Sequence, residues 1–281
     1  MPAKLIDGKK IAAEVIAQVK ARVKELKEKP GLAFVMVGSN PASELYVGKK
    51  EQMCKEAGFY SIVIKLKEDN SEMELMASVE KLNNDPKIHG IIVQLPLPKH
   101  INEMLVIDTI LPQKDADGFS PVNVGSMFIS RNRILPATPK GVIKLIESTG
   151  IKISGKHAVV VGRSNIVGKP VAQLLLQKDA TVTICHSKTE NIGEITKQAD
   201  ILVVAIGKPR FVTKEMVKAG AIVIDVGTSK VYDKVVGDVD FEEVKKIAGW
   251  ITPVPGGVGP MTVACLLENT LECIEIQKRI A

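Results

Sequence analysis

A tyrosine and a lysine, Tyr46 and Lys50, stand four residues apart in a segment with a helical pattern. Side chains at this spacing share one helix face, whereas Lys49 points about 100° away. A lysine whose pKa is lowered by burial can exchange protons near neutral pH, so the pair predicts a site of acid–base catalysis. A partly buried tyrosine beside a lysine whose stem covers apolar surface remains the alternative.

Two more polar side chains follow apolar segments. Gln94 comes near the end of the apolar run 91–95, just before two prolines, and Asp117 follows Asp115 in the segment KDADGF. Ligands of α/β proteins bind beyond the carboxyl ends of strands, and a carboxylate can accept two parallel N–H bonds from an amino-heterocycle. Pairing of the amide with loop backbone, or of the aspartate with a local turn, remains open.

Two glycine-containing loops are candidates for ligand contact. PVPGGVGP, residues 253–260, combines prolines that stiffen the chain with glycines that let a flat ligand approach the backbone. In VVVGRSNIVGKP, Gly162 ends an apolar run and Gly168 begins a helical pattern, so free N–H groups at the helix start can bind phosphate. The spacing differs from G-x-G-x-x-G, and a turn without a ligand remains possible.

The residues that follow favour NADP over NAD. Folds that prefer NAD usually carry an acidic residue about 20 positions on, which binds the ribose hydroxyl. Here the next apolar run leads into His186 and Ser187, and no acid precedes Glu190. Arg163, next to Gly162, supplies a cation suited to the additional phosphate of NADP.

Alternation of strand and helix patterns predicts an α/β protein of two lobes, each with a parallel sheet. The expected helices are 7–29, 43–57, 72–83, 102–111, 141–148, one beginning at 168, and 262–279. The expected strands are 32–38, 61–66, 91–95, 157–162, 181–185, 201–207 and 221–227.

The texture of the sequence also predicts how the two lobes are divided. Residues 112–140 hold few periodic elements and are interpreted as a crossing between lobes. We expect a first domain of residues 1–140, a second of 141–261, and a last helix within 262–281 that returns to the first lobe to bury its apolar face.

Composition narrows the class of protein. Of 281 residues, 45% are hydrophobic and 25% charged, which excludes a disordered chain or a disulfide mini-protein. The net charge of +6 suits small anionic ligands, while 4% aromatics and scattered cations argue against nucleic acid.

The cysteines predict neither a metal site nor a disulfide. They form no C-x-x-C pair that would suggest a metal site, and all four are interpreted as buried thiols. Without a long apolar run or signal peptide, we expect a cytoplasmic protein that does not enter a membrane.

The ordered set of motifs resembles one family over essentially the whole chain. The segments are VGSNPASELYVGKK, GIIVQLPLP, KDADGF, VVVGRSNIVGKP, CHSKT and ITPVPGGVGPMT. Their order is similar to that in the methylenetetrahydrofolate dehydrogenase/methenyltetrahydrofolate cyclohydrolase family. The resemblance implies a folate-binding catalytic domain followed by a Rossmann-like NADP domain, oxidation of methylenetetrahydrofolate with NADP and hydrolysis of the product to formyltetrahydrofolate. It also implies a homodimer and a role in one-carbon metabolism and purine biosynthesis.

The resemblance also implies roles for individual residues. Lys50 corresponds to the essential lysine of the hydrolytic step, Gln94 to its hydrogen-bond partner, and Asp117 to the carboxylate that pairs with the pterin. Tyr46 is expected to orient the folate and is counted with these three as catalytic. The implied folate contacts are Tyr46, Val93, Gln94, Leu95, Asp117, Pro255, Gly256, Gly257, Val258 and Gly259. The implied cofactor contacts are Gly162, Arg163, Ser164, Ser187 and Thr228.

Some positions depart from the family pattern, and other functions stay open. Ala116 and Ala137 replace a common valine and cysteine without touching the chemistry, whereas Thr228 replaces a common isoleucine and weakens that cofactor assignment. A dehydrogenase without hydrolase activity and a non-catalytic NADP sensor remain alternatives. A short-chain reductase with a Tyr-x-x-x-Lys pair is disfavoured because that pair should follow the dinucleotide loop, not precede it.

Overall fold

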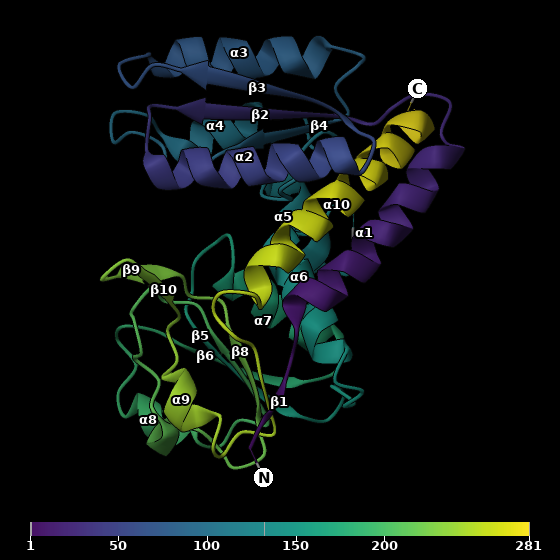
Figure 1. Ribbon diagram of the computed structural model, residues 1–281. Helices are drawn as coiled ribbons and strands as arrows, with labels where there is room; N and C mark the ends of the chain where they lie inside the picture. The colour runs from purple at the N-terminus through teal and green to yellow at the C-terminus, as the bar shows by residue number, and fades with distance from the viewer. Residues whose placement is uncertain (1, 132, 281) are drawn as a thin grey trace. The chain divides into compact units, whose positions relative to one another are not determined.

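The computed structural model describes residues 2–131 and 133–280, and the chain divides into two compact units (Figure 1). The six-stranded unit comprises residues 1–13 and 138–264, and the three-stranded unit comprises residues 14–137 and 265–281. Each unit has its own parallel sheet, as the alternating sequence pattern predicts.

The six-stranded unit contains one wholly parallel sheet in the order β1-β11-β8-β7-β5-β6. Its strands are β1 (Lys4–Leu5), β5 (His157–Val161), β6 (Thr181–Cys185), β7 (Ile201–Val204), β8 (Ile222–Asp225) and β11 (Trp250–Ile251), with a hairpin of β9 (Ser229–Val231) and β10 (Lys234–Val236). Its helices are α6 (Ala137–Glu147), α7 (Gly168–Gln177), α8 (Ile192–Thr196), the 3-10 turn η1 (Lys214–Met216) and α9 (Phe241–Val244).

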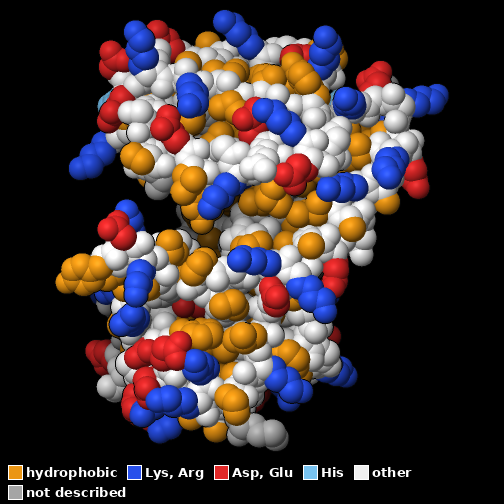
Figure 2. Space-filling view, in the orientation of Figure 1, with side chains coloured by type: hydrophobic (Ala, Val, Ile, Leu, Met, Phe, Trp, Pro, Cys, Tyr) orange, Lys and Arg blue, Asp and Glu red, His pale blue; other side chains and the backbone are white. Residues whose placement is uncertain are grey.

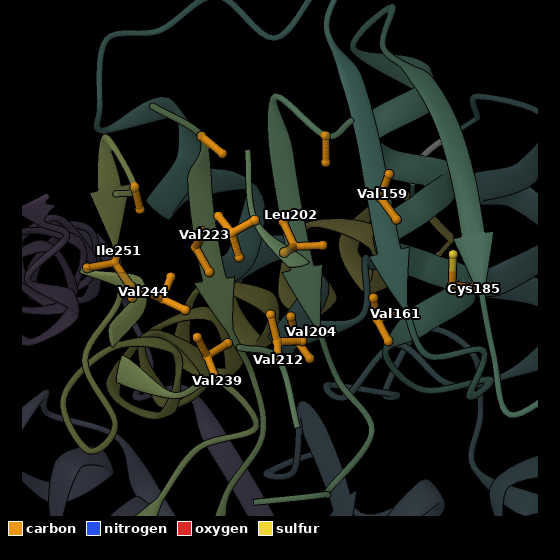
Figure 3. Close-up of a cluster of buried hydrophobic side chains, with 14 residues drawn as sticks. Val159, Val161, Cys185, Leu202, Val204, Val212, Val223, Val239, Val244 and Ile251 are labelled. Atoms are coloured by element: carbon orange, nitrogen blue, oxygen red, sulfur yellow. The ribbon is translucent and has the colours of Figure 1, made fainter. Parts of the chain in front are cut away.

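The core of this unit is built from β-branched and leucine side chains on the central strands. Figure 3 shows Val159 and Val161 of β5 beside Leu202 and Val204 of β7, and all four are buried. The strands are apolar on both faces because α7 packs against β5 and β6 on the side opposite to this cluster. A parallel sheet covered on both faces directs its carboxyl-end loops toward ligands.

The three-stranded unit has the strand order β3-β2-β4, again parallel. Its strands are β2 (Gly31–Val37), β3 (Tyr60–Leu66) and β4 (Gly90–Val93), and its helices include α2 (Pro41–Glu56), α3 (Glu72–Asn84), α4 (Glu103–Thr109) and α5 (Pro121–Phe128). Helices α3 and α4 pack their apolar side chains on one face of this sheet, and α2 lies on the other (Figure 1). Ser71 and Glu74 form a capping box that fixes the start of α3.

The last helix is α10 (Val258–Ile280), and from Cys265 onward it belongs to the three-stranded unit. Leu267 and Leu271 are buried, and Asn269 donates from Nδ2 to the carbonyls of Ala116 and Leu135, both at 2.8 Å. Nearby, α1 (Gly8–Glu25) lies alongside it, and Arg22 forms an ion pair with Glu275 (Figure 1).

Several elements differ from the sequence-based expectation. Residues 112–140 contain α5 and the start of α6, because Ser120 caps α5 through the N–H of Asn123 and Pro121 fits its first turn, signals too short to give a periodic pattern. Helix α10 begins at Val258, four residues early, and α1 ends at Glu25. The first residues, expected in the first lobe, pair with β11 through β1.

The surface charges and the cysteines agree with what the composition predicts. Lysine and arginine side chains are interspersed with acidic ones on the face shown in Figure 2. The four cysteines are free and buried, as expected. Among residues 2–131 and 133–280, no helix combines the length and apolar character that a membrane crossing requires.

We predict that Leu202→Ala lowers the free energy of unfolding by about 2–5 kcal/mol, because Leu202 is 0% exposed and its truncation leaves a cavity. Leu176→Ala is the matched control, since Leu176 is 55% exposed, and we expect a change within about 0.5 kcal/mol. Chemical denaturation measures both variants, and equal losses would contradict this placement of the core.

Candidate active site

The three-stranded unit brings Lys50 and Gln94 into direct contact. Lys50 lies in α2, is 8% exposed, and donates from Nζ to Gln94 Oε1 at 3.0 Å. Gln94 follows β4 and donates from Nε2 to the Leu95 carbonyl at 2.6 Å, while its backbone N–H donates to the Val35 carbonyl. The amide is thus fixed with its oxygen toward the lysine.

Burial disfavours the charged form of the Lys50 amine. Desolvation lowers the pKa of its amine, and the negative charge of Asp117 offsets this only in part. A lysine with a lowered pKa has a larger neutral fraction near pH 7 and can accept a proton there.

Asp117 is the third member of this group. The pKa of its carboxyl is raised to about 6, because burial and the charge of Asp115 raise it more than the charge of Lys50 lowers it. The structure therefore joins Lys50, Gln94 and Asp117 in one electrostatic group, which the spacing of these residues along the chain could not establish.

The loop that carries Asp117 is organised by its neighbour Asp115. The buried Asp115 carboxylate accepts hydrogen bonds from the N–H groups of Gly118 and Ser120 at 2.9 and 2.7 Å, and from Asn123 Nδ2 at 3.0 Å. Gly118 has φ +76°, and a Cβ there would lie 2.6 Å from the Leu135 carbonyl carbon. The turn role left open for an aspartate in KDADGF thus belongs to Asp115.

The remaining expected folate residues of this unit lie close to Lys50 and Gln94 along the chain. Tyr46 lies one turn before Lys50 on α2 and is 42% exposed, so its ring is available to a ligand. Val93 ends β4 and is buried, and Leu95 is half-buried.

A separate pocket of about 250 Å³ lies within the six-stranded unit, at the carboxyl ends of β5, β6 and β7. Three of the expected cofactor residues, Gly162, Arg163 and Ser187, line it. The whole lining is Val161, Gly162, Arg163, His186, Ser187, Ile192, Ala205, Ile206, Lys208 and Phe211.

Gly162, in the pocket lining, and Gly168, which begins α7, are both required by close backbone contact. Gly162 has φ +131°, and a Cβ there would lie 2.3 Å from the Ala205 carbonyl oxygen. A Cβ on Gly168 would lie 2.3 Å from the Gly162 carbonyl oxygen. The bare turn leaves main chain open to a dinucleotide, and Arg163 and Ser187 beside it fit an additional phosphate.

Two other expected cofactor residues lie outside the lining. Ser164 Oγ accepts hydrogen bonds from the N–H groups of Val167 and Gly168 at 3.1 and 3.2 Å, so its hydroxyl supports the start of α7. Thr228 is exposed in the connection between β8 and β9.

Sequence reasoning missed the side of the pocket that follows β7. Ile206, Lys208 and Phe211 lie there, and Lys208 Nζ is 5.8 Å from the centre of the Phe211 ring. Because β7 pairs directly with β5, the rule that ligands bind at the carboxyl ends of neighbouring strands could have identified this loop.

The segment of Pro255, Gly256, Gly257, Val258 and Gly259 lies in the six-stranded unit. Gly256 has φ +109°, and a Cβ on Gly257 would lie 2.6 Å from the Pro253 carbonyl oxygen. Val258 and Gly259 form the first turn of α10 instead of a loop.

The parallel sheet, its glycine turn and the cationic pocket define a dinucleotide-binding α/β protein, and the buried lysine group gives it a second site suited to proton transfer. Residues 6–117 match the family model for the tetrahydrofolate dehydrogenase/cyclohydrolase catalytic domain, and residues 136–278 match that for the NAD(P)-binding domain of the same family. The chain belongs to the tetrahydrofolate dehydrogenase/cyclohydrolase family.

Individual relatives agree with this assignment. The chain is 57% identical over 276 residues to the bifunctional protein FolD of Moorella thermoacetica, covering 97% of this chain and 99% of that one. The structure of the bifunctional FolD methylenetetrahydrofolate dehydrogenase/cyclohydrolase of Campylobacter jejuni matches with a TM-score of 0.96 and 46% identity, covering 98% and 99% of the two chains. The Trypanosoma brucei enzyme complexed with NADP and an inhibitor matches with a TM-score of 0.96 and 41% identity over 99% of each chain.

We predict that Lys50→Met raises the pKa of Asp117 above about 6, because the variant removes the positive charge that favours the carboxylate. Carbon NMR of labelled aspartate carboxyls across a pH titration measures the shift. Lys49→Met is the control, since the exposed Lys49 does not act on this carboxyl. An unchanged or lowered Asp117 pKa in Lys50→Met would show that the two groups are not coupled.

Proposed function

We propose that this protein oxidises methylenetetrahydrofolate to methenyltetrahydrofolate with NADP and then hydrolyses methenyltetrahydrofolate to formyltetrahydrofolate. The observation that carries the proposal is the buried Lys50, hydrogen-bonded to Gln94 and coupled to Asp117, in a chain that also has a dinucleotide pocket. These are the parts that the two reactions of the family require.

The dehydrogenase step uses the cofactor as hydride acceptor from the methylene carbon of the folate, when NADP is bound. Arg163 and Ser187 would hold the 2′-phosphate, and the bare turn at Gly162 would admit the diphosphate. Ser164 and Thr228 remain proposed cofactor contacts, Ser164 through the loop that it stabilises. The protein's contribution to this step is alignment of the reacting carbon.

The hydrolase step depends on Lys50. With its pKa lowered by burial, the neutral amine can accept a proton from the water that attacks the methenyl carbon and return it as the ring opens. Gln94 holds the amine in position through its amide oxygen. Asp117 would bind the N–H donors of the pterin, which demands the charged carboxylate.

The remaining residues would shape the folate site. Tyr46 offers an exposed ring for packing against the ligand, and Val93 and Leu95 supply apolar surface beside Gln94. The segment Pro255–Gly259 stays a proposed folate contact. We further propose that residues 1–140 with 262–281 form the folate-binding domain and residues 141–261 the NADP-binding domain, apart from β1, which pairs with β11 of the six-stranded sheet.

The family relationship supports a proposal for the oligomeric state, the location and the metabolic role of the protein. We propose a homodimer in the cytoplasm that supplies one-carbon units, including those for purine biosynthesis. We propose folates as the partners of this protein, and we propose that it binds neither nucleic acid nor a membrane.

We predict that Lys50→Met lowers cyclohydrolase kcat by about 10²–10⁴-fold, because the variant removes the group that transfers the proton. The loss of absorbance of methenyltetrahydrofolate, corrected for spontaneous hydrolysis, measures this rate. Lys49→Met is the matched control and should retain activity. Turnover of Lys50→Met at the wild-type rate would contradict the proposed role of this lysine in proton transfer.

We predict that Arg163→Ala weakens NADP by about 10- to 100-fold and NAD by much less, because the proposed partner of the guanidinium is the additional phosphate that NAD lacks. Titration calorimetry with each cofactor measures the two affinities. Lys169→Ala is the control, since the amine of Lys169 donates to Asn165 and does not line the pocket. Equal losses for NADP and NAD would refute the phosphate assignment.

A further inference from the structure

Two buried aspartates of the six-stranded unit have no place in either proposed site. Asp225 ends β8 and is 3% exposed, and Asp238 follows β10 and is 0% exposed. The Asp225 carboxylate accepts hydrogen bonds from the N–H groups of Gly227, Asp238 and Val239 at 3.1, 2.9 and 2.9 Å. It therefore fastens the chain after the β9–β10 hairpin to the chain that precedes the hairpin.

Asp238 extends this fastening to the dinucleotide pocket. One of its oxygens, Oδ2, accepts hydrogen bonds from the N–H groups of Ile206 and Gly207 at 2.7 and 2.9 Å. Ile206 and Lys208, the residues on either side of Gly207, both line the pocket. Through these backbone N–H groups, the carboxylate thus fixes the segment that forms one wall of the pocket.

Two glycines make room for these carboxylates, because a side chain at either glycine would collide with one of them. A Cβ on Gly227 would lie 2.1 Å from Asp238 Cγ, and a Cβ on Gly237 would lie 1.9 Å from Asp225 Oδ2. Each carboxylate packs against a glycine close to the other aspartate in the chain, Asp238 against Gly227 and Asp225 against Gly237. Such interlocked contacts fix the loops relative to one another more firmly than exposed loop contacts do.

We propose that Asp225 and Asp238 are positioning residues for NADP, which set the loop after β7 at the distance that the cofactor requires. The inference rests on the assignment of the pocket to NADP. The arrangement is costly in itself, since burial and the nearby Asp238 raise the pKa of the Asp225 carboxyl to about 7 even though its bonds from backbone N–H groups lower it. A costly pair of acids behind a ligand pocket is better explained by positioning than by stability.

The test compares Asp238→Ala with Asp238→Asn. The alanine variant loses both bonds to the pocket loop, so we expect the Kd and KM for NADP to rise about tenfold while kcat at saturating NADP stays within about twofold. The asparagine variant keeps an acceptor oxygen but loses its charge, so a smaller rise, about threefold, is expected.

Asp200→Ala is the matched control. The Asp200 carboxylate also accepts a backbone N–H bond, from His157 at 3.0 Å, but it precedes β7 at the amino edge of the same sheet. We expect this variant to lose stability and to bind NADP as the wild type does. A loss of NADP affinity in Asp200→Ala equal to that in Asp238→Ala would overturn the inference, because general destabilisation would then suffice.

The remaining outcomes also decide the matter. Wild-type NADP affinity in folded Asp238→Ala would overturn the inference, and if that variant fails to fold, an unchanged affinity in Asp238→Asn would overturn it. If Arg163→Ala weakens NADP and Asp238→Ala does not, the pocket assignment stands and the positioning role falls. If Arg163→Ala leaves NADP affinity unchanged, both fall together.

Discussion

The chemistry of this protein depends on one unfavourable arrangement, the burial of the Lys50 amine. In water a lysine holds its proton far above neutral pH and is a poor base at pH 7. Here the surrounding protein removes water, and a neutral amide oxygen replaces it as the hydrogen-bond partner at 3.0 Å. Because an amide offers less compensation than a carboxylate would, the pKa of the amine stays lowered despite the more remote charge of Asp117. The rest of the three-stranded unit provides the rigid support that this arrangement needs: α2 for the lysine, the end of β4 for Gln94, and the Asp115 turn for Asp117.

The six-stranded unit follows a different principle, in which main chain and close contacts prevail. Its pocket begins where Gly162 approaches the Ala205 carbonyl oxygen so closely that no Cβ would fit. On the other side, the loop after β7 is held through its N–H groups by a buried carboxylate. Such a pocket suits the proposed dinucleotide, which would be bound by shape and by a few directed charges, among them Arg163. We therefore propose cofactor binding and proton transfer for different units of the same chain.

Much of this organisation could be predicted from the sequence, because its main signals are local. The apolar runs gave both parallel sheets, and the four-residue spacing put Tyr46 and Lys50 on one helix face. Contacts between distant segments could not be predicted: the bond from Lys50 to Gln94 spans 44 residues, and the bond from Ile206 to Asp238 spans 32. Short elements such as α5 and the β9–β10 hairpin escaped for another reason, since caps and turns over a few residues leave no periodic pattern.

The central claim is that one chain carries out two successive reactions. The most direct measurement is an incubation with methylenetetrahydrofolate and NADP in which NADPH and methenyltetrahydrofolate are quantified separately. The account predicts that NADPH forms while methenyltetrahydrofolate does not accumulate beyond what spontaneous hydrolysis leaves. NADPH accompanied by an equal amount of methenyltetrahydrofolate would contradict it, because the Lys50 group would then be silent, and no NADPH with either cofactor would remove the dehydrogenase as well.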